Sequence, residues 1–139
     1  MKGFFQFGSP IIVLVVEGKK IEMLLDTGFN GHLMLPQAEI DELGLEQIGI
    51  SDYLTASGQS KLTKVYIANI WFFDSKIEAP VLSTDADFSL AGMELFHNCR
   101  IVIEMSELLR YNPLYLSSGQ TSNSEHDQKH APCFSSECF

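Results

Sequence analysis

Three consecutive residues, Asp26-Thr27-Gly28, could carry chemistry in this chain. They lie in the stretch LLDTGFNGHLMLP, which runs from Leu24 to Pro36. A carboxylate directly after an apolar run is either a turn residue or a group held in place for acid–base work. The three residues alone leave both interpretations open, because Asp and Gly are common in turns.

A catalytic role for Asp26 would require a second carboxylate. Two carboxylates that face each other share one proton, so one acts as a general base on water while the other polarises a carbonyl group. The chain contains no internal repeat that would supply a second Asp-Thr-Gly. The other six aspartates are followed by neither Thr-Gly nor Ser-Gly: Asp41, Asp52, Asp74, Asp85, Asp87 and Asp127. The chain itself therefore contains a single copy of this motif.

The segments before Asp26 predict a β-hairpin. Residues 11–16 form a continuous aliphatic run of strand length, and residues 17–20 have turn composition. Residues 21–25 place apolar side chains at every second position, which is the period of a strand. The hairpin would deliver the chain directly to Asp26.

The chain beyond the motif predicts further short strands with one or two short helices, and hence a mostly β domain. Turn residues separate these apolar runs, and Pro36 and Gly44 are suited to the first position and the end of a helix. The expected elements are a strand at 31–35, a helix over 36–45, a hairpin over 52–73 that turns at 56–59, a strand at 77–83, a short helix after Gly92 and a strand at 100–105.

The composition changes near residue 110. We predict one domain over residues 1–110 and a flexible polar tail over 117–139, because the tail is rich in Ser and has almost no aliphatic residues. Three cysteines, Cys99, Cys133 and Cys138, are an odd number, and two lie in the tail. This usage argues against a disulfide framework and favours a reducing, cytoplasmic location.

The net charge of −9 argues against binding to nucleic acid or to an anionic membrane surface, since both attract clustered Lys and Arg. No run approaches the roughly 20 apolar residues of a membrane span. The tail cysteines, with His126 and His130 upstream, match no zinc spacing. We therefore expect no metal and no cofactor.

The loop Asp26-Thr27-Gly28-Phe29-Asn30-Gly31 and its flanks resemble the retropepsin-like aspartic proteases. The pattern D-T-G-F-x-G is most similar to the small prokaryotic branch of that family. The resemblance covers about residues 10–105. It runs through IEMLLDTGFNGHLMLPQAEIDELGL, the hairpin LTASGQSKLTKVYIANIWF, APVLS and LAGMELFHNCRIVIE.

The resemblance implies a fold and an activity. The fold would be a closed β-barrel with one or two short helices and a mobile hairpin, or flap, over the site. The activity would be that of an aspartic endopeptidase that cleaves peptide or protein substrates as a homodimer, with one Asp26 from each subunit.

The resemblance also implies roles for individual residues. Asp26 would be catalytic, and Thr27, Gly28 and Gly92 would support the catalytic loop. The substrate and flap positions would be Phe29, Asn30, Ser57, Gly58 and Gln59.

Three features depart from the better-known members of the family. Phe29 stands where those enzymes have Ala or Ser, although the small prokaryotic branch also has Phe. Asn30 and Met93 stand where retroviral members often have an acid paired with an Arg, and Ala91 stands where a large aliphatic residue usually precedes the late glycine. A second function therefore stays open: a catalytically weak or inactive dimeric module that binds peptides or proteins on the same fold. The retained carboxylate of Asp26 favours the enzyme, because an inactive binder would not need it.

Overall fold

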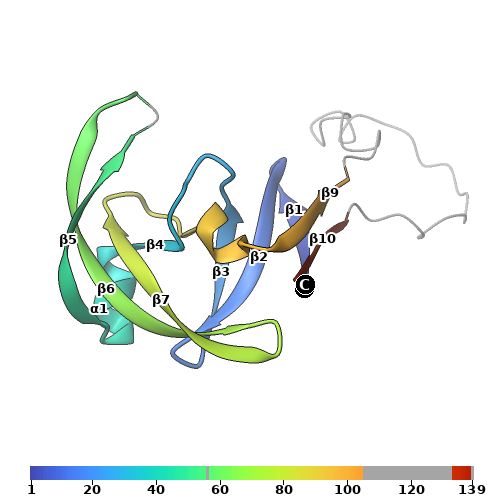
Figure 1. Cartoon of the computed structure of the whole chain (residues 1–139), viewed down its shortest axis with the longest axis horizontal. Helices are drawn as coiled ribbons and strands as arrows, with labels where there is room; N and C mark the ends of the chain where they lie inside the picture. The colour runs from blue at the N-terminus through green and yellow to red at the C-terminus, as the bar shows by residue number, and fades with distance from the viewer. Residues whose placement is uncertain (56, 105–132, 139) are drawn as a thin grey trace, which may run out of the picture.

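Residues 1–55, 57–104 and 133–138 are described by the structure, a computed structural model (Figure 1). It is mostly β with one α-helix, as expected from the sequence. The elements in order are β1 (Lys2–Gln6), β2 (Ser9–Val16), β3 (Lys19–Leu25), β4 (Leu33–Pro36), α1 (Gln37–Leu43), β5 (Glu46–Leu54), β6 (Ser60–Phe72), β7 (Ser75–Thr84), β8 (Leu90–Ala91), the 3-10 helix η1 (Met93–Phe96), β9 (Cys99–Ile103) and β10 (Cys133–Cys138).

The described strands form one sheet that bends back on itself. Its order is β5-β6-β7-β4-β8-β3-β2-β1-β10-β9, and β6 also pairs with β2. This extra pairing places Val15 opposite Trp71 and Val16 opposite Ile70. Strands β6, β7, β4, β8, β3 and β2 are thereby joined in a ring of pairings.

The predicted hairpin that leads to Asp26 is confirmed as β2 and β3, which pair from Ile11↔Leu24 to Val16↔Lys19. Beyond it, β3 also pairs in parallel with the two-residue strand β8. Strand β8 pairs on its other side with β4, which follows the Asp26 loop. The loop is therefore anchored at both of its ends to β8.

The predicted helix is α1, with a small shift at its start. Pro36 is the residue before the first helical turn rather than the first helical residue, and Gly44 ends the helix in the left-handed conformation at φ 65°. Ile40 is its buried residue and packs into the core. Within the described residues, no helix is long and apolar enough to cross a membrane.

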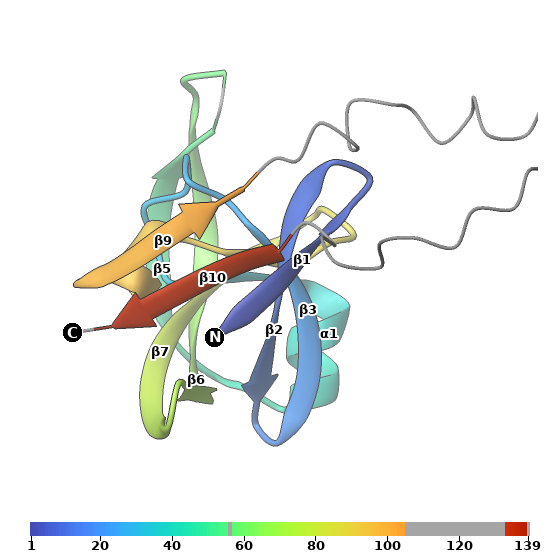
Figure 2. The same ribbon diagram turned by 90° about the vertical axis from the view of Figure 1, so that its right-hand side faces the viewer.

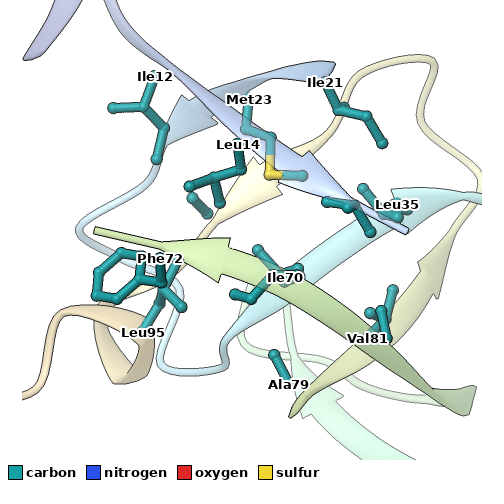
Figure 3. Packing of buried hydrophobic residues seen from close by; sticks show 14 of the residues in the cluster. Ile12, Leu14, Ile21, Met23, Leu35, Ile70, Phe72, Ala79, Val81 and Leu95 are labelled. Carbon is teal, nitrogen blue, oxygen red and sulfur yellow. The ribbon is translucent and has the colours of Figure 1, made fainter. Parts of the chain in front are cut away.

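The hydrophobic core lies inside the ring of strands (Figure 3). Alternate residues of β2 and β3 point inward, and β6, β7, β4 and η1 supply the opposing side chains. Strand alternation therefore decides which face of β2, β3, β6 and β7 is buried, whereas Leu33, Met34 and Leu35 of β4 are all buried. The largest fully buried side chains are Ile12, Leu14, Met23, Leu33, Leu35, Ile40, Ile70, Val16 and Val81.

The C-terminal end of the chain differs from the expected flexible tail. Strand β10 lies between β1 and β9 and pairs antiparallel with both, as Figure 2 shows. The rest of the predicted tail lies outside the described residues. Backbone pairing with two neighbours lets this short polar segment join the sheet without an aliphatic face of its own.

Cys99 is disulfide-bonded, which differs from the expectation that the cysteines form no disulfide. Cys138 is the register partner of Cys99 in the β9–β10 pair. The number and spacing of cysteines could not reveal this register, because β9 and β10 are far apart in the sequence.

The same Leu→Ala substitution should have different effects on stability at a core position and at an exposed position. Leu14 is 1% exposed and Leu62 is 75% exposed. We expect Leu14→Ala to lower the free energy of unfolding by about 2–5 kcal/mol, because it removes buried surface and leaves a cavity. Leu62→Ala is the matched control and should change it by less than about 0.5 kcal/mol. Urea unfolding measures both values, and equal effects would contradict the assigned core.

Candidate active site

Asp26 follows directly after the last residue of β3, and backbone groups hold it there. Its N–H donates to the carbonyl oxygen of Ala91 at 3.0 Å, and its own carbonyl accepts from the N–H of Phe29 at 3.2 Å. The N–H of Gly28 donates to Oδ1 of the Asp26 side chain at 2.9 Å. The carboxylate is therefore oriented within a tight turn that the strand end positions.

This hydrogen bond is of the local kind that an aspartate in a turn makes, and it fixes the direction of the Asp26 carboxylate. The side chain of Asp26 is half-buried, whereas Thr27 and Gly28 are exposed. Within the described residues, Oδ2 of Asp26 has no hydrogen-bond partner, so it is open to a water molecule or a second carboxylate. A carboxylate with one anchored oxygen and one free oxygen can accept a proton from water.

Gly92 and the residues after it lie beneath the Asp26 loop and bind its backbone. The N–H of Gly92 donates to the carbonyl of His32 at 2.8 Å, and the N–H of Met93 donates to that of Phe29 at 2.8 Å. The N–H of Glu94 donates to the carbonyl of Gly31 at 3.2 Å. The structure thus places the late glycine in direct contact with the loop.

Phe29 fills the space between the loop and the segment beneath it. A Cβ atom placed on Gly92 would lie 2.2 Å from the carbonyl oxygen of Gly31 and 2.4 Å from Cδ1 of Phe29. A Cβ atom on Gly31 would lie 2.4 Å from Cζ of the same ring. The ring therefore packs against both glycines, in addition to any contact with substrate.

The predicted flap residues lie at the tip of the β5–β6 hairpin. The N–H of Gly58 donates to the carbonyl of Thr55 at 2.8 Å, and Gly58 has φ 78°, which glycine adopts without strain. Ser57, Gly58 and Gln59 are exposed. Figure 1 shows this hairpin and the loop after β3 rising on the same side of the molecule.

The structure brings only some of the predicted site residues together. Asp26, Gly28, Phe29 and Gly92 form one contact cluster. Thr27 and Asn30 are exposed, and within the described residues their side chains form no hydrogen bond. The flap tip forms hydrogen bonds within its own turn. No group of three His, Cys, Asp or Glu side chains in the described chain could hold a metal ion.

An ion pair joins the β5–β6 hairpin to the loop after β7. The sequence did not indicate it. Lys61, near the start of β6, pairs with Asp85. The hydrogen bond from Lys61 and its positive charge lower the pKa of the Asp85 carboxyl group, and Asp85 in turn raises the pKa of Lys61. No local pattern could reveal a contact between residues so far apart in the sequence.

Comparisons with known proteins find similarity at the level of structure. No protein-family model matches the chain, and no curated protein sequence matches it. A retropepsin-like aspartic protease from Rickettsia conorii matches with a TM-score of 0.56 at 18% sequence identity, covering 77% of this chain and 84% of that one. The EIAV protease in complex with the inhibitor HBY-793 matches with a TM-score of 0.55 at 17% identity, covering 68% of this chain and 90% of that one.

At these sequence identities the likeness concerns the fold. Both matches extend over more than four fifths of the known protease chains, so the similarity includes the whole architecture rather than one hairpin. The chain therefore has the fold that retropepsin-like aspartic proteases share.

Proposed function

We propose that this protein is an aspartic endopeptidase whose active site pairs Asp26 of two identical subunits. The observation that carries the proposal is the Asp26 carboxylate, anchored by Gly28 at the end of β3, on a fold shared with aspartic proteases. The loop D-T-G-F-x-G further supports a place in the small prokaryotic branch of that family.

The mechanism follows from two facing carboxylates. Two such groups cannot both ionise at low cost, so the pair holds one proton. The ionised Asp26 removes a proton from a water molecule, which attacks the peptide carbonyl. The protonated Asp26 of the other subunit donates a hydrogen bond to the carbonyl oxygen as negative charge develops there. Transfer of that proton to the carbonyl oxygen gives a tetrahedral diol. The first Asp26 then gives the proton that it took from water to the leaving nitrogen, the C–N bond breaks, and a diol hydroxyl proton returns to the second Asp26.

The neighbouring residues take supporting roles in this proposal. Gly28 donates the hydrogen bond that orients the carboxylate, and Gly92 allows the backbone beneath the loop to approach closely. The exposed hydroxyl of Thr27 is free within the described chain to bond the partner's loop. Asn30 and the flap tip, residues 57–59, would contact the bound peptide.

The homodimer is part of the proposal, because the chain contains a single Asp-Thr-Gly. A two-fold axis next to Asp26 brings each loop against its own copy. Each subunit carries a net charge of −9, so salt should strengthen the association by screening the repulsion between subunits.

Substitution of the carboxylate tests the proposed chemistry. We expect Asp26→Asn to lower peptide cleavage by at least about 10²–10⁴-fold, since the amide cannot act as a general base. A mixed peptide library analysed by mass spectrometry measures cleavage. Asp74→Asn, in the exposed turn after β6, is the control and should cleave like wild type. Wild-type activity in the Asp26 variant would refute the assignment, and a wild-type protein that binds but never cleaves peptides would support the inactive binding module.

Gly92 should tolerate no side chain beneath the loop. We expect Gly92→Ala to lower the free energy of unfolding by about 1–3 kcal/mol, because the new Cβ would collide with the backbone oxygen of Gly31. Gly49→Ala is the matched control, since a Cβ there meets no atom within 4 Å. Urea unfolding and cleavage assays measure the effects, and an equal result for both variants would contradict the described contact.

Assembly should control activity. Specific activity should fall on dilution as dimers dissociate, and an excess of Asp26→Asn subunits should suppress wild-type activity by forming heterodimers. Sedimentation velocity at the assay concentration measures the species present. A monomer with full specific activity would exclude the shared site.

A further inference from the structure

A hollow of about 600 Å³ opens beside the strand that leads to Asp26. It lies between the turn joining β1 to β2, the start of α1 and the loop that precedes β8. Lys20, Glu22 and Leu24 line it from the face of β3 opposite to the core-facing residues. The volume falls within the roughly 300–1,000 Å³ of ordinary ligand sites.

Exposed aromatic rings border this hollow. Phe7 is 100% exposed and Phe88 is 52% exposed, and both line it. Phe7 also has φ 50°, a left-handed conformation that is uncommon for a bulky residue. Leu24, Ile11 and Pro36 add apolar surface. Solvent-facing aromatic rings over an apolar floor suit the aliphatic part of a side chain from a bound peptide.

The charged groups of the hollow are mostly acidic. Glu22, Glu39 and Asp87 line it together with one lysine, Lys20. The ion pairs found among the described residues are Lys19–Glu42 and Lys61–Asp85, so no described Lys or Arg lies within 4 Å of these three carboxylates. Lys20 lines the hollow and Lys19 interacts electrostatically with Glu39, but the three carboxylates still outnumber the lysine of the lining, and this net negative charge suits a cation.

Glu39 is also held in position. The buried hydroxyl of Ser89 donates to Oε2 of Glu39 at 2.7 Å, and Ser89 is only 6% exposed. A carboxylate fixed by a buried donor loses little side-chain freedom when it binds a ligand, which favours affinity. The acidic side of the hollow is thus partly organised before any ligand arrives.

Asp26 does not line the hollow, but the lining reaches to within two residues of it along the chain. Leu24 lies two residues before Asp26, which corresponds to about 7 Å along an extended strand. An extended peptide advances by about 3.3 Å per residue, so a residue within a few positions of the scissile bond could place its side chain in the hollow.

We propose that the hollow selects peptide substrates with an arginine or lysine close to the scissile bond. The methylene groups of that side chain would lie against Phe88 and Leu24, with the cation among Glu22, Glu39 and Asp87. An aromatic ring at the rim also attracts a cation. This inference rests on the proposed peptidase function and adds a substrate class to it.

Matched peptides test the preference. Starting from a peptide that the enzyme cleaves, one arginine is moved through the positions around the scissile bond, and each version is paired with a citrulline version that lacks the charge. We expect one position at which citrulline lowers kcat/KM by about tenfold or more, as for loss of a charged hydrogen bond, mainly through KM. Equal cleavage of all pairs would overturn the inference while leaving the peptidase intact.

Variants of the protein locate the preference. Glu22→Gln and Asp87→Asn should each reduce the arginine-to-citrulline ratio, whereas Glu46→Gln and Asp74→Asn, outside the hollow, should retain it. Melting temperatures confirm that each variant folds. Unchanged ratios in the variants of the hollow would overturn the inference.

Binding to an inactive protein separates the inference from the peptidase proposal. Fluorescence polarisation with labelled arginine and citrulline peptides is measured on the Asp26→Asn protein. Tighter binding of arginine peptides that Glu22→Gln weakens would support the hollow even if wild-type protein cleaved nothing, and only the peptidase proposal would then fail. Equal binding of both peptides would count against the hollow.

Discussion

The backbone contact between the Asp26 loop and the segment around Gly92 determines the geometry of the site. Hydrogen bonds join residues 26–32 to residues 91–94 at both ends and in the middle of the loop. Strand β8, only two residues long, extends this contact by pairing with β3 on one side and β4 on the other. Because main-chain groups supply these bonds, the position of the carboxylate depends little on the side chains around it.

The sequence predicted a helix or strand well where the spacing of apolar residues or a turn residue identifies it locally. The aliphatic run of β2, the alternation of β3, the turn at Gly58 and the end of α1 at Gly44 all lie where local patterns placed them. Strand β1 was not predicted, because its sequence KGFFQ does not alternate apolar and polar residues. The pairing of β8 with β3 could not be predicted from local patterns either. The alternation of apolar residues indicates that a strand exists, but it does not indicate which other strand it pairs with.

The candidate site also combines features that the local sequence predicts with contacts between distant segments that it does not predict. Asp26 and its turn could be predicted from three consecutive residues, whereas the Lys61–Asp85 ion pair joins two separate strand regions. The hollow is assembled from the β1–β2 turn, β3, α1 and the loop before β8. Each segment has the sequence of ordinary protein surface. The excess of carboxylates over lysines arises only when folding brings the segments together.

Phe29 makes the loop's tolerance to change depend on the order in which changes occur. At position 31 the obstacle to a side chain is the ring of Phe29, so a smaller residue at position 29 would remove it. At position 92 the obstacles include the main-chain oxygens of Gly31 and Phe29, which remain whatever side chain stands at position 29. Positions 29 and 31 are therefore epistatic, and an evolving lineage would have to shrink the ring before it could gain a side chain at 31. Position 92 would remain glycine in either background.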